Sequence, residues 1–368
     1  MRLFLVLITI LIGIIPYFTG IKIEQQFIEK TNSLNESANL KLLQNNYRRG
    51  WFNSNAIYLV KINEQLFSFE HNINHGWMPV LKISIYTIVK SSNQILLDIF
   101  TKVKLNGDNV SIVNVSNLEV ANYKWQGLQG NIYANRQFTN VEAEFNSSQL
   151  NYNQLKVQNA ALQLNINNGI ANGNLEIASI LGQGLDLEDI KFFGKGQIKN
   201  NNLILTVQNI IKKVQDYGSS SSNIELSNIY LPSLLKSILT YSENITFNWL
   251  IQGMELLEYL PKLVITNFKL NTPEGLVHGK LHIQLKPLKN PLLVIFNPNS
   301  MLNILDLQLS ASVPKLLSII TSNQLSNSWI QQGFLIEDDL NYYKSDVTLN
   351  DGLLRINKQQ LPLTVLIP

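Results

Sequence analysis

The four histidines of the chain come as two pairs with the same spacing, His71 with His75 and His278 with His282. Two histidines four residues apart can bind one zinc ion when they lie on a helix. On a strand they share a face, but their backbones lie about 13 Å apart at ~3.3 Å per residue, and zinc needs donor atoms at about 2.0–2.1 Å. Both pairs lie in segments with strand-like alternation, so neither is expected to bind a metal by itself. His278 and His282 lie on the polar positions and are expected to be solvated.

His71 and His75 fall on the apolar positions of their segment, which favours partly buried structural histidines. Asn72 stands where an H-E-x-x-H motif has its glutamate, so a metalloprotease site here would lack the general base. The alternative is a metal-dependent hydrolase near His71 and His75. That site would require both side chains to converge with a carboxylate, such as Glu70 or a more distant one.

Other catalytic motifs are absent from the sequence. There is no G-x-S-x-G, P-loop or G-x-G-x-x-G motif, and the chain has no cysteine for thiolate catalysis or metal binding. The acidic cluster Glu337–Asp339 suits a turn, and the pairs Arg48–Arg49 and Lys212–Lys213 are too short for a nucleic-acid footprint at a net charge of +3. We therefore expect a protein that is not an enzyme, without a cofactor or metal and without a nucleic-acid partner.

The first 21 residues are expected to be a transmembrane signal anchor. Residues 3–21 carry no charge and are close to the ~20 residues that cross a bilayer. The chain lacks a small-x-small cleavage site after this segment, so an uncleaved membrane anchor is expected, with the body outside the cytoplasm. The alternative is a cleaved signal peptide. Residues 22–46 follow with a partly helical apolar stripe, which predicts a stalk helix or, as the alternative, a helix packed on the body.

The body is predicted to be mainly β with some α. Residues 47–215 form an N-terminal β-rich region of short alternating segments separated by Asn, Gly and Ser, including turn signals at 106–108, 167–169 and 172–173. The serine-rich stretch after Asp216 is the expected boundary to a C-terminal α+β region, 216–368, with helices near 231–260 and 314–332. We expect an extended, curved antiparallel sheet that is partly covered by these helices.

Several short motifs, in order, resemble the YdgA-like family of bacterial proteins. They lie in the ranges Tyr47–Ala56, Ile73–Pro79, Asn271–Gly275 and Asn350–Asn357. Members of that family look like inner-membrane-anchored periplasmic proteins of unknown function, and none of the motifs is catalytic in form. The family tends to have His-Gly-Pro where this chain has His75, Gly76 and Trp77.

The motif positions of unknown role are Tyr47, Arg49, Gly50, Phe52, His75 and Gly76. The first four favour a structural junction between helix and sheet, because Gly50 permits an unusual backbone angle and the aromatic side chains can pack. The alternative is contact of the aromatic and arginine side chains with lipid headgroups. The expected partners are the membrane and a lipid or another apolar ligand, so the protein would be an envelope scaffold or a lipid binder. Self-association into a homo-oligomer through strand edges is a further alternative.

Overall fold

The computed structural model describes thirteen stretches of the chain. They are residues 20–25, 27–29, 40–62, 65–75, 83–91, 94–104, 106–120, 123–182, 184–230, 259–287, 301–317, 329–339 and 341–361. Strands make up 75% of the described residues and helices 6%, so the fold is mainly β. The chain divides into two compact units, residues 1–168 and 169–368. The expected boundary at residue 216 differs from this division.

The first unit contains eleven described strands. They are β1 (Leu40–Arg49), β2 (Asn53–Ile62), β3 (Gln65–Asn74), β4 (Ile83–Ser91), β5 (Gln94–Val103), β6 (Asn109–Val115), β7 (Leu118–Val120), β8 (Tyr123–Trp125), β9 (Leu128–Ala134), β10 (Asn140–Tyr152) and β11 (Leu155–Asn167). Strands β1 to β6 pair consecutively and antiparallel, and β6 then pairs with β9, β9 with β10 and β10 with β11. The short hairpin of β7 and β8 joins the same edge of β10 as β9.

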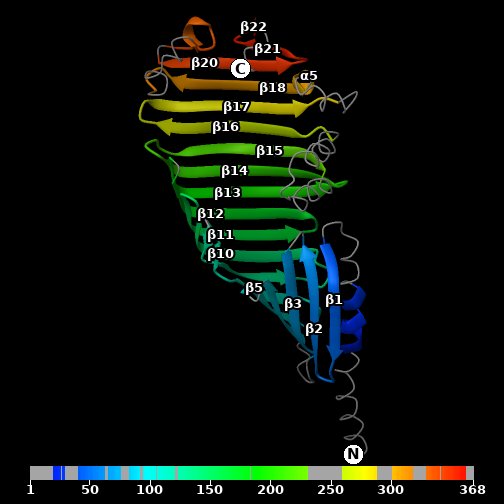
Figure 1. The fold of residues 1–368 in the computed structure, drawn as a ribbon. Helices are drawn as coiled ribbons and strands as arrows, with labels where there is room; N and C mark the ends of the chain where they lie inside the picture. The colour runs from blue at the N-terminus through cyan, green and yellow to red at the C-terminus, as the bar shows by residue number, and fades with distance from the viewer. Residues whose placement is uncertain are drawn as a thin grey trace, which may run out of the picture. The chain divides into compact units, whose positions relative to one another are not determined.

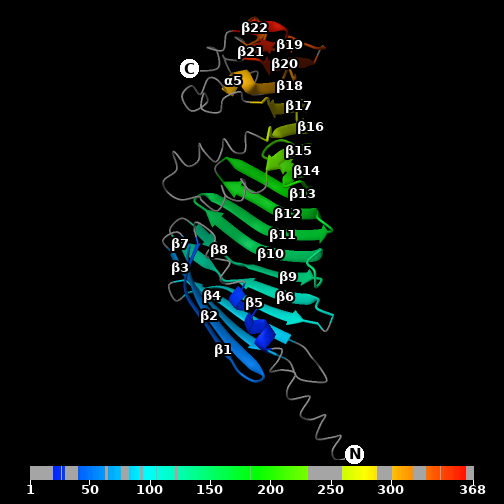
Figure 2. The same ribbon diagram turned by 90° about the vertical axis from the view of Figure 1, so that its right-hand side faces the viewer.

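The second unit is an antiparallel sheet in which almost every strand pairs with its neighbour in sequence (Figure 1). Its elements are β12 (Ile170–Gly182), β13 (Leu185–Lys199), β14 (Asn202–Val214), β15 (Ser220–Tyr230), β16 (Lys262–Thr272), β17 (Gly275–Leu285), the short helix α5 (Met301–Ile304), β18 (Leu305–Pro314), β19 (Ile336–Glu337), β20 (Tyr342–Asn350), β21 (Leu353–Ile356) and β22 (Gln359–Leu361). Strand β20 pairs with both β18 and β19. Figure 2 shows β12 to β17 in the same order from the side.

Turn chemistry explains several hairpins. Gly107 has a φ of 88° in the turn expected at 106–108, and Asn200 and Asn201 have φ values of 51° and 63° in the turn that joins β13 to β14. Asparagine tolerates this left-handed conformation better than most residues. The turn expected at 172–173 is wrong, because Asn172 and Gly173 pair with Lys195 and Gly194 inside the β12–β13 ladder.

The expected helices are corrected in part. Residues 20–25 and 27–29 are helical, but residues 40–49 form β1, so a stalk helix over 22–46 is wrong in its last part. The helix expected from Pro314 does not begin there, because Pro314 is the last residue of β18. Residues 231–258 and 318–328, which hold most of the two expected C-terminal helices, lie outside the described residues.

The expected transmembrane segment also lies almost wholly outside the described residues, which begin at Gly20. Within the stretches listed above, no helix is both long enough and apolar enough to cross a membrane.

Candidate functional site

A sharp hairpin tip joins β1 to β2 and contains two of the motif residues, Gly50 and Phe52. The tip consists of Gly50, Trp51 and Phe52, between Arg49 at the end of β1 and Asn53 at the start of β2. The Gly50 N–H donates to the Asn53 carbonyl at 2.7 Å. A Cβ on residue 50 would lie 2.6 Å from that carbonyl oxygen, so glycine is required by this close approach.

His75 holds the hairpin tip from the end of β3. Its backbone N–H donates to the Phe52 carbonyl at 2.8 Å, and its Nδ1 lies 3.4 Å from the Trp51 carbonyl oxygen. Its Nε2 lies 2.8 Å from the Ser54 hydroxyl oxygen. Because a carbonyl can only accept, Nδ1 is the donor in the contact with Trp51, whereas the Ser54 hydroxyl can donate to or accept from Nε2. His75 and Ser54 are both fully buried.

The N-terminal helix, residues 20–25 and 27–29, lies on this face of β1 to β3 (dark blue in Figure 1). Gly20, Glu24 and Phe27 have the spacing of one helix face, i, i+4 and i+7. Gly20 packs on the His75 ring so closely that a Cβ there would lie 2.9 Å from Nδ1 and closer still to Cε1. Glu24 Oε2 lies 2.6 Å from Arg49 Nη1 in a partly buried ion pair.

An aromatic cluster continues the contact between the helix and the sheet. The Phe27 ring centroid lies 5.4 Å from that of Tyr47 and 5.8 Å from that of Tyr58. Tyr58 stacks on Phe69 at 4.6 Å and on His71 at 5.3 Å. Such ring pairs stabilise by about 0.5–1.5 kcal/mol beyond their area burial. Burial raises the pKa of the Tyr47 and Tyr58 hydroxyls, with the neighbouring Ser54 hydroxyl opposing the rise at Tyr47.

His71 is the titratable group of this cluster. Its Nδ1 lies 2.8 Å from the Thr87 hydroxyl oxygen, whereas its Nε2 is buried without a hydrogen-bond partner. The Phe27 ring meets the His71 ring edge-on at 5.7 Å. Burial lowers the pKa of His71 to about 4, so the ring is neutral at pH 7.

The Ser54–His75 hydrogen bond joins the atom types that a serine hydrolase uses for nucleophile activation. Both side chains are nevertheless buried beneath the helix, where a substrate has no approach. His71 uses a different hydroxyl, and Glu70 is ion-paired with Lys90 at 2.7 Å. Within the described stretches, no group of three or more histidine, aspartate or glutamate side chains is placed to hold a metal ion. The contacts of Ser54 and His75 therefore position the N-terminal helix and the hairpin tip.

The remaining candidate residues lie apart from this junction. His278 and His282 lie on β17, where His278 is exposed, as expected. The expectation is wrong for His282, which is only partly exposed and whose Nε2 is buried without a hydrogen-bond partner. Gly76 lies outside the described residues. The acidic cluster leads from β19 into the connection to β20, because Glu337 is the last residue of β19 and Asp339 Oδ1 accepts the N–H groups of residues 341 and 342.

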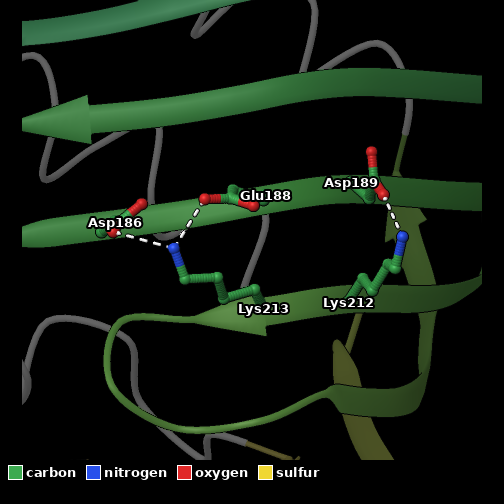
Figure 3. Close-up of polar contacts among 5 residues, drawn as sticks. All are labelled: Asp186, Glu188, Asp189, Lys212 and Lys213. Carbon is green, nitrogen blue, oxygen red and sulfur yellow. Dashed lines mark hydrogen bonds and ion pairs between the residues drawn. The ribbon is translucent and has the colours of Figure 1, made fainter.

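Carboxylates on β13 neutralise the lysine pair Lys212–Lys213 (Figure 3). Lys213 Nζ lies 2.6 Å from Glu188 Oε1 and 3.4 Å from Asp186 Oδ2, and Lys212 Nζ lies 3.0 Å from Asp189 Oδ2. These hydrogen bonds, with the Coulomb attraction, raise the pKa of both lysines. The pair is therefore part of a mixed-charge surface on β13 and β14.

Sequence reasoning placed Phe27 on the apolar stripe of the predicted helix but missed the other residues that complete the junction, namely Gly20, Glu24, Ser54, Tyr58 and Thr87. The helical spacing of Gly20, Glu24 and Phe27 was the one local signal for their shared face.

Comparison with known proteins identifies the family and nothing finer. Neither the curated proteins nor the solved structures include one that matches this chain. The YdgA-like resemblance indicated by the short motifs stays a prediction, because the match names only a family of unknown function. That match covers residues 2–364, and the chain therefore belongs to the family described as "Bacterial protein of unknown function (DUF945)".

Proposed function

We propose that this protein is anchored in the bacterial inner membrane, with its body in the periplasm, and binds lipid or another apolar ligand along one face of its second unit. The anchor is supported by the uncharged segment 3–21. The ligand class is supported by a row of apolar side chains that crosses many strands.

The apolar side chains form two parallel rows of cross-strand partners on the same face, which we call the apolar ladder. The first row is Leu205, Leu226, Leu263, Ile283, Leu307, Leu349 and Leu354. The second row is Val207, Ile224, Ile265, Leu281, Leu309, Val347 and Ile356. Each residue of one row lies two positions from its neighbour in the other row, so all of them point to one side of the sheet.

The opposite face of the same strands is mostly polar, with Ile204 and Val264 as apolar members. It carries Lys280 and His282 on β17, Ser310 and Gln308 on β18, and Thr348 on β20. The sheet is therefore two-sided, with the apolar material collected on one face.

Most ladder side chains keep part of their surface exposed. Only Leu349 and Leu354, at one end, are buried, whereas Leu309 in the middle is 37% exposed. Neighbouring strands are ~4.8 Å apart, so the seven strands of the ladder span about 29 Å. That length is roughly twice the ~15 Å of hydrocarbon in one bilayer leaflet, enough for an extended acyl chain.

Photo-crosslinking tests this proposal. The full-length protein would be reconstituted with a phospholipid that carries a photoactivatable group in its acyl chain, and adducts would be mapped by mass spectrometry. We expect adducts on the ladder, with labelling reduced in Leu309→Asn and unchanged in the matched control Gln308→Asn, which alters the polar face. Membrane-bound protein without ladder adducts would contradict lipid binding and favour an envelope scaffold.

A further inference from the structure

We propose that the hairpin tip, with Trp51 and Phe52, is a membrane-contact surface that docks on the bilayer at the point where the anchor leaves it. This inference rests on the proposed membrane anchor, because a body released from the membrane would have no bilayer beside it. The occupant is a lipid surface with anionic headgroups.

The first argument is exposure. Trp51 and Phe52 are consecutive large aromatic residues at a turn. Trp51 is 50% exposed and Phe52 is 48% exposed. Tryptophan is favoured where a bilayer meets water, because its ring is apolar while its indole N–H can stay hydrated. Phe52 adds apolar surface beside Trp51.

The second argument is position. Residues 3–19 are apolar and lead directly into Gly20. Gly20 packs on the His75 ring, and His75 binds the carbonyls of both Trp51 and Phe52. A chain of direct contacts therefore fixes the tip next to the residue at which the apolar segment ends. If that segment crosses the bilayer, the tip lies at the headgroup layer.

The third argument is charge. Arg48 near the end of β1 and Lys22 in the N-terminal helix are both exposed. Glu24 is neutralised by Arg49, and Glu29 lies nine residues from Gly20, which is about 14 Å along a helix. The surface around the tip thus has a surplus of positive charge, and basic residues near a membrane favour anionic lipids.

The tip is also held firmly enough to be presented to a surface. Two contacts from His75, to the Trp51 and Phe52 carbonyls, and the Gly50–Asn53 hydrogen bond fix its backbone. Its aromatic side chains can therefore dock without first ordering the loop, which lowers the entropic cost of binding.

The chain has no cysteine, so single fluorescent labels test this inference cleanly. The full-length variants Phe52→Cys and Arg48→Cys would be labelled with an environment-sensitive fluorophore and reconstituted in phosphatidylethanolamine–phosphatidylglycerol vesicles. Phe138→Cys is the matched control, because Phe138 is 66% exposed in a turn of the same unit. Circular dichroism would establish that each variant is folded.

We expect a blue shift of the emission and loss of intensity with headgroup-spin-labelled lipid for both tip labels, and neither change for the control label. Flotation of the vesicles separates the possible failures. If the chain floats and the tip labels behave like the control label, the docking inference is wrong while the anchor stands. If the chain does not float, both the anchor and the docking inference are overturned.

Discussion

The imidazole of His75 occupies the space that a side chain on Gly20 would need. Residue 20 is helical and residue 75 follows β3, so this one contact joins the N-terminal helix to the sheet. Because the contact is so close, a single methyl group added at residue 20 would disturb the junction.

We predict that Gly20→Ala destabilises the protein. In an unconstrained helix this change stabilises by about 1 kcal/mol, but overpacking against a buried ring costs about 1–3 kcal/mol. The urea midpoint of the full-length protein should therefore fall. Gly194→Ala is the control, since a Cβ there would lie no closer than 3.9 Å to its nearest atoms, which is ordinary van der Waals contact. A Gly20→Ala variant as stable as the parent would show that the helix does not seat on His75.

Ser54→Ala should destabilise the protein by about 1–3 kcal/mol, because it removes the buried hydrogen bond between the Ser54 hydroxyl and His75 Nε2. Ser91→Ala removes a hydroxyl that donates to the Leu66 carbonyl at an exposed site and should cost less than about 0.5 kcal/mol. Denaturant unfolding at pH 7 measures both. Equal losses would mean that the Ser54–His75 hydrogen bond is not buried in solution.

The stability of the protein should fall with decreasing pH because of His71. Its folded pKa is about 4, below the usual value of 6.5, so the unfolded chain binds the proton first. The stabilisation is complete above pH 6.5 and is lost progressively as the pH falls toward 4, by up to about 3 kcal/mol. His71→Phe, which keeps a ring in the cluster, should flatten the unfolding free energy over this window. An unchanged pH profile in that variant would contradict the burial of His71.

The strands were predictable because alternation is a local property. His71 and His75 were placed correctly on the apolar face by counting positions along one segment. The error at Asn172–Gly173 has a physical cause, since an Asn-Gly pair permits a turn but does not impose one when both flanks pair with a long neighbouring strand.

The junction could not be derived in the same way, because its contacts are non-local. Glu24 and Arg49 are 25 residues apart, and Ser54 and His75 are 21 residues apart. Periodicity in a short window identifies the face on which each residue lies but not the element that covers that face. The stalk helix was extended too far for the same reason, since a weak helical stripe in residues 40–46 cannot compete with pairing of β1 to β2.

The ion pair between Glu24 and Arg49 should contribute about 1 kcal/mol to helix docking, at the upper end for partly exposed pairs. A double-mutant cycle with Glu24→Gln and Arg49→Gln measures the coupling, and high salt should reduce it. The pair Lys124–Glu119, which is more exposed, is the control and should show a smaller coupling. Equal coupling energies for the Glu24–Arg49 and Lys124–Glu119 pairs would mean that packing of the helix on the sheet does not strengthen the Glu24–Arg49 ion pair.

The two ends of the apolar ladder should respond differently to truncation. Leu354 is 2% exposed, so Leu354→Ala should cost about 2–5 kcal/mol, as in a packed core. Leu309 is far more exposed, so its truncation removes less buried apolar area, and Leu309→Ala should cost about 1 kcal/mol or less. Urea unfolding of the two full-length variants gives the comparison. If Leu309→Ala costs as much as Leu354→Ala, the ladder is closed along its whole length, and the face then has no room for an acyl chain.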